Sequence, residues 1–240
     1  MRVDDAFRRT CAALCELIWP PQCVLCGGRG PAERDLCEGC ERDLPRNEQC
    51  CSVCAQPLYV DDDDAICGAC LRRMPRFDAC FAPYRYAYPL DHMIRALKYG
   101  GGVAHGRVLA DLFVSRWREA HDEPPEVLLP VPLGTARFGE RGYNQAIELA
   151  TRMSRQLAIP LRTDLLVRTR ETREQAGLDR AERRKNLRKA FAARRALPAA
   201  HVAIVDDVVT TGSTANEIAR VLKRAGAERV EVWAIARAGK

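Results

Sequence analysis

From Pro75 onward, two spacings of apolar residues alternate along the chain. Short apolar runs alternate with longer stretches in which apolar residues return every three or four positions, as in an amphipathic helix. This pattern predicts strands over residues 80–88, 127–133, 164–167, 201–207 and 229–237, and helices over 90–99, 103–120, 143–158, 181–191 and 214–226. Strands that alternate with helices in this way are typical of a parallel sheet covered on both faces, so an α/β fold is expected.

The residues before Pro75 have a different pattern. Apolar positions in residues 5–18 return at helical spacing, and two prolines follow, which predicts a short amphipathic helix. Residues 22–71 contain few apolar stretches and could not bury a core by themselves. We therefore expect an N-terminal helix, a small domain held together by something other than hydrophobic packing, and an α/β domain, over residues 1–20, 21–75 and 76–240.

Cysteine content suggests what holds the small domain together, because eleven of the twelve cysteines lie in the first 70 residues. Eight of them form four Cys-x-x-Cys pairs: Cys23 with Cys26, Cys37 with Cys40, Cys51 with Cys54, and Cys67 with Cys70. Two residues between thiolates form a tight knuckle that presents both sulfurs to one tetrahedral ion, and two knuckles complete a four-cysteine site. The sequence therefore predicts two structural zinc ions, with Cys50 as an alternative to Cys51.

Other uses of cysteine fit the sequence less well. The first residues carry several charges and no uninterrupted apolar run of the kind a secretion signal needs, and no apolar run approaches the ~20 residues of a membrane span. A redox site would need only one Cys-x-x-Cys pair, usually at the start of a helix beside a strand. We expect a cytoplasmic protein with zinc-bound thiolates, in which Cys11 and Cys15 pack within the N-terminal helix.

Charge is spread unevenly over the chain, whose formal net charge is +6. Residues 134–195 hold 16 Lys+Arg against 7 Asp+Glu, whereas residues 20–75 hold 6 Lys+Arg against 10 Asp+Glu. The basic region would attract phosphates of a metabolite or of a nucleic acid, although solvated arginine-rich helices would have the same composition. Any contact with single-stranded DNA is expected mainly in this region, including Arg183, Arg184, Lys185, Arg188 and Lys189.

Residues 203–214, with the sequence AIVDDVVTTGST, carry the clearest candidate chemistry. Asp206 and Asp207 at the end of a strand could accept hydrogen bonds from ribose hydroxyls and lie near a bound Mg²⁺. The hydroxyl and backbone N–H groups that follow would form an anion site at a helix N-terminus, from Thr210, Thr211, Gly212, Ser213 and Thr214. A Walker B strand would require a separate phosphate-binding loop, G-x-x-x-x-G-K-[ST], which the chain lacks.

This stretch resembles the phosphoribosyl pyrophosphate (PRPP) signature of type I phosphoribosyltransferases, which is four apolar residues, two acids, a short linker and T-T-G-x-T. Three further stretches, LKYGG (97–101), VPLGTARFGERGYNQAIELA (131–150) and REQAGLDRAERRKNLRKAF (173–191), follow the paired cysteines. Together they make the whole chain similar to the ComF/GntX family, also called competence protein F. The resemblance implies a type I phosphoribosyltransferase-like sheet flanked by helices, a double zinc ribbon before it, and an association with DNA uptake in natural transformation.

The resemblance also implies roles for individual residues. Arg137, Arg141 and Gly142 would belong to a loop that meets the pyrophosphate, and Lys98 would supply a second cation there. Fixed cations suit this position because negative charge develops on a leaving pyrophosphate. The basic segment 168–189 is a candidate for a mobile loop that closes over the substrate and excludes water, with a plain basic helix as the alternative.

Two functions follow from this interpretation. The first is a Mg²⁺-dependent phosphoribosyltransferase that consumes PRPP, for which the sequence identifies no acceptor. The second is a non-catalytic single-stranded DNA-binding protein that uses the phosphoribosyltransferase fold as a PRPP-sensing platform. The expected partners are PRPP, single-stranded DNA and other DNA-uptake proteins.

Overall fold

The computed structural model describes residues 22–31, 34–60, 62, 64–99, 102–170, 187, 189–197 and 199–239. The expected N-terminal helix, with Cys11 and Cys15, lies outside these residues, as does most of the basic stretch between residues 171 and 186. The chain forms two compact units, residues 1–44 and 45–240, which are described in turn.

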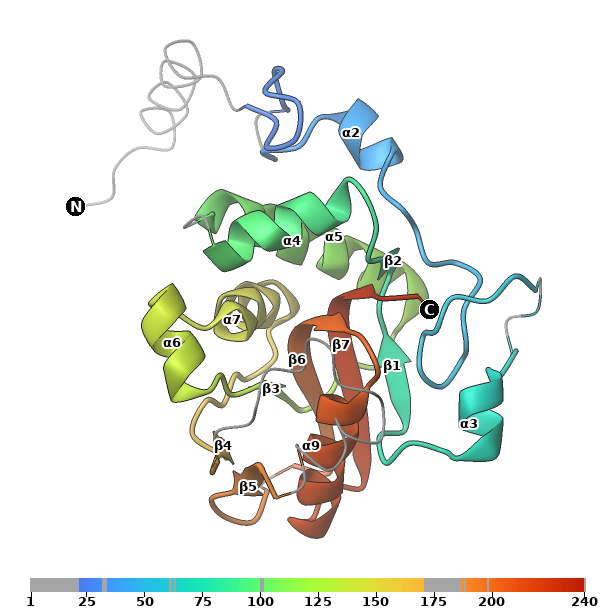
Figure 1. The fold of residues 1–240 in the computed structure, drawn as a ribbon, viewed down its shortest axis with the longest axis vertical. Helices are drawn as coiled ribbons and strands as arrows, with labels where there is room; N and C mark the ends of the chain where they lie inside the picture. Colours follow the sequence, from blue (N-terminus) through green and yellow to red (C-terminus); the bar gives the residue numbers. More distant parts are fainter. Residues whose placement is uncertain are drawn as a thin grey trace. The chain divides into compact units, whose positions relative to one another are not determined.

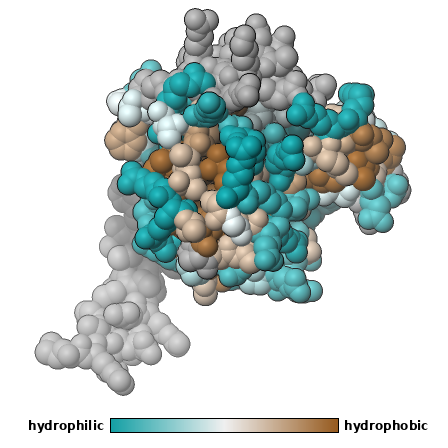
Figure 2. Space-filling view, turned by 90° about the horizontal axis from the view of Figure 1, so that it is seen from below, coloured by the Kyte–Doolittle hydropathy of each residue, from teal (hydrophilic) through white to brown (hydrophobic). Residues whose placement is uncertain are grey.

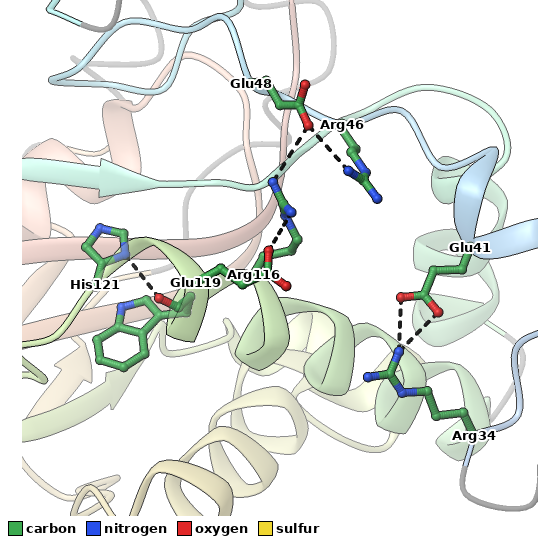
Figure 3. Close-up of polar contacts among 8 residues, drawn as sticks. Arg34, Glu41, Arg46, Glu48, Arg116, Glu119 and His121 are labelled. Atoms are coloured by element: carbon green, nitrogen blue, oxygen red, sulfur yellow. Dashed lines mark hydrogen bonds and ion pairs between the residues drawn. The ribbon is translucent and has the colours of Figure 1, made fainter. Parts of the chain in front are cut away.

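The first unit is built around two cysteine knuckles. A tight turn follows Cys23, whose N–H donates to the carbonyl of Gly28 at 2.8 Å. Helix α2 (Glu38–Arg42) begins at Cys37, and the sulfur of Cys37 caps the helix by accepting from the N–H of Cys40. Arg34 and Glu41 form a salt bridge at 3.0 Å across this unit (Figure 3). In the described part of the unit, the buried apolar side chains are Cys23, Leu36 and Leu44.

A parallel sheet forms the centre of the second unit (Figure 1). Its strand order is β1-β7-β6-β3, with the short β2 also beside β7, and each of these pairings is parallel. The bounds are β1 (Ala79–Phe81), β2 (Tyr84–Arg85), β3 (Val127–Pro130), β6 (His201–Val209) and β7 (Arg229–Arg237). The predicted α/β fold with a parallel sheet is confirmed.

Helices cover both faces of this sheet, because side chains along a strand point alternately to opposite sides. Ile204 and Val232 pack in one hydrophobic cluster with Ile218 of α9 (Ser213–Arg224). On the other side of β7, the ring of Trp233 lies 5.4 Å from Phe113 of helix α5. The helices are α4 (Leu90–Tyr99), α5 (Val103–Ala120), α6 (Thr135–Arg141), α7 (Gln145–Leu157) and α9.

Three sequence predictions of elements were wrong. The single strand expected over residues 80–88 is divided into β1 and β2 around Pro83, which has no N–H for strand pairing. The strand expected at 164–167 is β4 (Leu166–Arg168), which lies outside the parallel sheet and pairs antiparallel with β5 (Phe191–Ala193). The helix expected over 181–191 does not extend to its last residue, because Phe191 begins β5.

The second set of cysteine knuckles belongs to the same compact unit as the sheet. Cys51, Cys54, Cys67 and Cys70 are buried in the hydrophobic cluster that also contains Ile204 and Ile218. Helix α3 (Gly68–Arg72) begins directly after Cys67. The predicted division of the chain at residue 75 stays a prediction.

Residues 50–74 carry this second set of knuckles and are called the second ribbon below. Some of their apolar side chains lie on the surface. Tyr59 is 93% exposed, and Leu71 and Met74 are exposed as well. Figure 2 shows hydrophobic surface on the lobe at the right of the view, where α3 lies in Figure 1. Because these side chains add nothing to a core, the ribbon depends on its cysteines and on contact with the sheet.

Ion pairs connect the segment after Pro45 to α5 (Figure 3). Glu48 lies between Arg46 at 3.5 Å and Arg116 at 3.8 Å, and Arg116 also reaches Glu119 at 2.6 Å. The Glu48 side chain is 62% exposed, so these ion pairs contribute little to stability.

Among the described helices, none is both long and apolar enough to cross a membrane.

We predict that Phe113→Ala lowers the free energy of unfolding by about 3–5 kcal/mol, because it removes a fully buried ring from between Phe81 and Trp233 and leaves a cavity. Urea unfolding followed by circular dichroism measures the change. Tyr59→Ala is the matched control, since it removes an exposed ring and should change stability by less than about 0.5 kcal/mol. Equal losses in both variants would contradict the packing described for this face of the sheet.

Candidate functional site

Strand β6 carries the two candidate carboxylates near the carboxyl edge of the sheet. The backbone N–H of Asp207 donates to Oδ1 of Asp206 at 2.9 Å, which fixes the Asp206 side chain against the backbone of Asp207. Lys98, near the end of α4, places Nζ 2.9 Å from Oδ2 of Asp207. The side chains of Lys98 and Asp207 are only 21% and 12% exposed, so this ion pair is partly shielded from water. The fold thus brings together three residues that the sequence selected from different motifs.

The loop after β6 has the form of an anion site. Gly212 adopts φ +72°, a conformation that L side chains rarely adopt, and it is the N-cap of α9. The hydroxyls of Thr211 and Ser213 lie 2.9 Å apart, and the N–H of Ser213 points to Thr211 Oγ1 at 3.4 Å. The first N–H groups of a helix have no intrahelical partners and favour an anion, so the loop places donors where a phosphate could bind.

A cleft of about 370 Å³ is lined by the two carboxylates and by the two ends of this loop, Thr210 and Thr214, but not by Thr211, Gly212 or Ser213. Of the residues selected from the sequence, Lys98, Arg141, Asp206, Asp207, Thr210 and Thr214 line it. The cleft wall also includes Tyr86 after β2, Asn144 and Gln145 at the start of α7, and Arg168 on β4. The cleft therefore combines two acids with three basic side chains and several hydroxyl and amide groups.

Arg141 occupies a different local structure from the one expected. Residues 135–141 form helix α6, which ends at Gly142 with φ +75°, so Arg137 and Arg141 lie on a helix and not in a loop. The Arg141 guanidinium donates to Gln145 at 3.1 Å and lies 5.2 Å above the ring of Tyr99. The described side chains include Arg141 but not Arg137, whose expected role stays a prediction.

Asn144 and Tyr86 line the cleft but were not predicted from the sequence. Asn144 caps α7 through Oδ1, which accepts from the N–H of Ala146, and its Nδ2 donates to the carbonyl of Val131 beyond β3. This one side chain fixes the start of α7 to the end of β3, and the N-cap position of Asn before an amphipathic helix could have indicated it. Tyr86 gave no such signal, because only the pairing of β2 with β7 brings it to the cleft.

Each of the two cysteine clusters has the geometry of a tetrahedral metal site. The sulfurs of Cys23, Cys26, Cys37 and Cys40 all lie within 4.8 Å of one another, as do those of Cys51, Cys54, Cys67 and Cys70. The measured Sγ–Sγ separations are 3.8 Å for Cys26 and Cys37 and 3.6 Å for Cys54 and Cys67. A tetrahedron with Zn–S bonds of about 2.3 Å has edges of about 3.8 Å, so zinc fits both clusters. Cys50 lies outside the second cluster, which contains Cys51.

Local hydrogen bonds lower the pKa of one thiol in each cluster. Burial works to raise the pKa of the Cys67 thiol, but hydrogen bonds from the backbone N–H of Cys70 and from neighbouring thiols outweigh it and hold the pKa at about 7. The pKa of Cys23 is lowered in the same way, against its burial, to about 6. A thiolate is the form that binds zinc, so both sites begin with a ligand that loses its proton easily.

Comparisons with known proteins agree with both halves of this description. Residues 14–75 match the family model of a double zinc ribbon domain, and residues 144–240 match that of a phosphoribosyl transferase domain. Competence protein F of Haemophilus influenzae is 36% identical over 225 residues, which cover 90% of this chain and 97% of that protein. The chain belongs to the competence protein F family. The family resemblance and the fold class expected from the sequence are therefore confirmed.

Other relatives of the family cover much of the chain. DNA utilization protein YhgH of Escherichia coli O157:H7 is 34% identical over 206 residues, or 84% of this chain and 90% of that protein. Competence protein ComFC of Streptococcus pneumoniae is 26% identical over 156 residues, or 65% of this chain and 67% of that protein. In this family, the two cysteine clusters fit the two structural zinc sites of a double zinc ribbon.

We predict two zinc ions per chain, measured by mass spectrometry of the metal in purified protein. Cys26→Ser combined with Cys40→Ser should leave one zinc ion, because serine hydroxyls do not replace thiolates as zinc ligands. Cys50→Ser is the control and should retain both ions, since Cys50 is outside the cluster. A wild-type protein with one zinc ion or none would contradict the assignment, as would the loss of zinc on replacing Cys50.

Proposed function

We propose that this protein binds PRPP together with Mg²⁺ in the cleft at the carboxyl edge of the sheet, as a phosphoribosyltransferase-like member of its family. The observation that carries the proposal is the convergence of Asp206, Asp207 and Lys98 with Thr210 and Thr214, the two ends of the hydroxyl-rich loop, on one cleft of about 370 Å³. A pentose that carries phosphate groups at two positions needs both hydroxyl acceptors and separate anion sites. The cleft offers each of these.

The ribose, the 5′-phosphate and the pyrophosphate of PRPP each match the chemistry of groups in or beside the cleft. Carboxylates accept hydrogen bonds from vicinal hydroxyls, which suits Asp206 and Asp207 to the ribose. The donors at the N-terminus of α9 suit the 5′-phosphate. Lys98 and Arg141 are the cations proposed for the pyrophosphate, and Arg168 is a third basic side chain in the cleft wall.

The same carboxylates suit a magnesium ion. Mg²⁺ in proteins is usually bound by one or two carboxylates together with substrate phosphates, and oxygen is its preferred ligand. The donor set of Asp206 and Asp207 fits an ion of this kind that arrives with a diphosphate. When bound, Mg²⁺ would neutralise charge on the pyrophosphate, while the chain itself orients the ribose and the 5′-phosphate.

A link to DNA is the second part of the proposal. Its support is that relatives over most of the chain are named for competence and for DNA utilization, together with the excess of basic residues between 134 and 195. PRPP binding and DNA binding are compatible, since occupancy of the cleft could regulate contacts of the basic region. This protein would then be either an active transferase or a PRPP-sensing DNA-binding protein, and pyrophosphate release in a screen of acceptor bases separates the two.

We predict that Asp206→Asn combined with Asp207→Asn weakens PRPP binding in the presence of Mg²⁺ by roughly 10-fold or more. The reason is that hydrogen bonds to charged groups contribute about 1.5–3 kcal/mol each, and the amides are poorer Mg²⁺ ligands. Isothermal titration gives the dissociation constants. Asp122→Asn with Glu123→Gln is the matched control, an exposed adjacent acid pair before β3 that should leave affinity unchanged. Equal affinity in the wild type and the site variant would remove the assignment.

We predict that binding of single-stranded DNA, measured by fluorescence anisotropy, falls steeply with salt. Each phosphate neutralised by a Lys or Arg contributes a slope of about −0.7 in log K against log salt. Replacing the five basic residues Arg183, Arg184, Lys185, Arg188 and Lys189 by Ala should flatten this slope. Arg72→Ala with Arg73→Ala, in the second ribbon, should leave it nearly unchanged. The opposite ranking of the two variants would place the DNA surface on the ribbon.

A further inference from the structure

Arg237 is a buried cation whose side-chain hydrogen bonds, within the described residues, all go to backbone carbonyls. It is the last residue of β7 and is 5% exposed. Its Nε donates to the carbonyl of Cys54 at 2.9 Å, and its Nη1 donates to the carbonyls of Val209 at 3.0 Å, Thr210 and Ala238 at 2.9 Å. None of the ion pairs found among the described residues involves Arg237. Burying a charge is costly unless it is well compensated, so these carbonyls hold it in a defined position.

The carbonyls that Arg237 contacts belong to two different sites. Val209 and Thr210 lead from β6 into the candidate phosphate loop. Cys54 is one of the four cysteines of the second cluster. One guanidinium therefore donates hydrogen bonds both to the backbone of a zinc knuckle and to the backbone that leads into the loop proposed for the 5′-phosphate.

Two further contacts join the end of the second ribbon to the same loop. The N–H of Arg76 donates to Oδ1 of Asn216, in the first turn of α9, at 2.7 Å. The ring of Phe77 lies beside Gly212. A Cβ added at Gly212 would be in van der Waals contact with this ring, at 3.9 Å. Phe77 and Val209 also share a hydrophobic cluster with the four cysteines. The loop thus packs against the ribbon through its carbonyls, its N-cap glycine and the first turn of its helix.

Charge gives a reason why metal at the second cluster would matter to Arg237. Four thiolates around one Zn²⁺ carry a formal net charge of −2, which favours a nearby buried cation. Without the metal, thiols regain protons and the knuckle loses the bonds that fix its backbone. The position of the Cys54 carbonyl, and with it one of the partners of Arg237, would then no longer be fixed.

We propose that the second zinc site positions the phosphate loop through Arg237, so that zinc at Cys51, Cys54, Cys67 and Cys70 and binding of a sugar 5′-phosphate strengthen one another. Arg237 is a positioning residue in this scheme and does not touch the ligand. The inference rests on the PRPP site proposed above. It does not extend to the first cluster, which belongs to the other compact unit.

The first test measures binding of three ligands, each with Mg²⁺, to Arg237→Lys and Arg237→Gln by isothermal titration. We expect PRPP and ribose 5-phosphate to bind about tenfold more weakly to both variants, within the range typical of coupling between sites, because neither side chain can reach several carbonyls with a planar fork. Binding of pyrophosphate, which lacks the 5′-phosphate, should change by less than about twofold. A general loss of structure would instead weaken all three ligands alike.

Arg229→Gln is the matched control, because Arg229 lies at the opposite end of the same strand, where its half-exposed side chain pairs with the buried Glu231 at 2.8 Å. It should leave all three dissociation constants unchanged. Zinc content and circular dichroism of each variant show whether it folds.

The second test measures zinc affinity, and its main comparison needs no change in the buried core. In the Cys26→Ser, Cys40→Ser protein, the remaining zinc ion would lie in the second cluster, and its equilibrium with a coloured zinc chelator gives its affinity. Coupling between two sites is reciprocal in binding free energy, so Mg²⁺ with ribose 5-phosphate should raise the zinc affinity by about tenfold, and Arg237→Gln in this background should abolish the increase. Mg²⁺ with pyrophosphate, as a control for phosphate that simply binds zinc, should raise it much less.

The outcomes separate the two proposals. If the wild type does not bind PRPP, the proposed function and this inference both fail. If the wild type binds PRPP and ribose 5-phosphate but ribose 5-phosphate leaves the zinc affinity unchanged, the inference alone is wrong. That result decides the matter even if the Arg237 variants do not fold, and selective weakening of the two 5′-phosphate ligands together with tighter zinc binding would establish the link.

Discussion

Parallel pairing of β6 with β7 is the constraint on which the rest of the second unit depends. The two nine-residue strands are in register from His201 with Arg229 to Val209 with Arg237, and their apolar side chains are buried on both faces. Because the strands are parallel, their carboxyl ends meet at one edge of the sheet. Asp206, Asp207 and the loop at 210–214 therefore emerge beside Arg237 and Tyr86. The cleft is a consequence of strand direction as much as of the residues that line it.

Cysteine clusters take the place of a hydrophobic core in the ribbons, but the two clusters differ in their surroundings. The first includes exposed or half-buried sulfurs, such as that of Cys26, in a unit with few buried apolar side chains. The second is buried throughout and shares its packing with Val209 and Ile218. Metal at the second site would therefore stabilise part of the sheet domain as well as the ribbon, which is the physical basis for the proposed link between this site and the candidate phosphate loop.

Patterns that depend on neighbours in the sequence predicted the fold well. The helices at 90–99 and 103–120 and the strand at 229–237 have the expected bounds, because their apolar spacing is regular and each is long enough to show it. Failures occurred where the element was short. The strand predicted at 80–88 contains Pro83, which signals the break but not that both pieces pair with β7, and β4 and β5 are only three residues each. Helix α6, with Gly139 inside it, was expected to be a loop.

The sequence by itself determined the chemistry of this protein: four cysteine pairs spaced for zinc, two acids at the end of a strand, and a hydroxyl-rich turn before a helix. These features could be recognised because their members lie within a few residues of one another. Tertiary structure alone decided that Lys98 pairs with Asp207, that Tyr86 and Arg168 face the same cleft, and that Arg237 joins Cys54 to Thr210. Arg237 lies 27 residues from Thr210 and 183 residues from Cys54, and only the packing of the helices, the knuckles and β4 around the parallel sheet brings such partners together. No local pattern predicts these pairings: LKYGG drew attention to Lys98 but gave no sign of its partner, and an arginine at the end of one strand looks in sequence like any other.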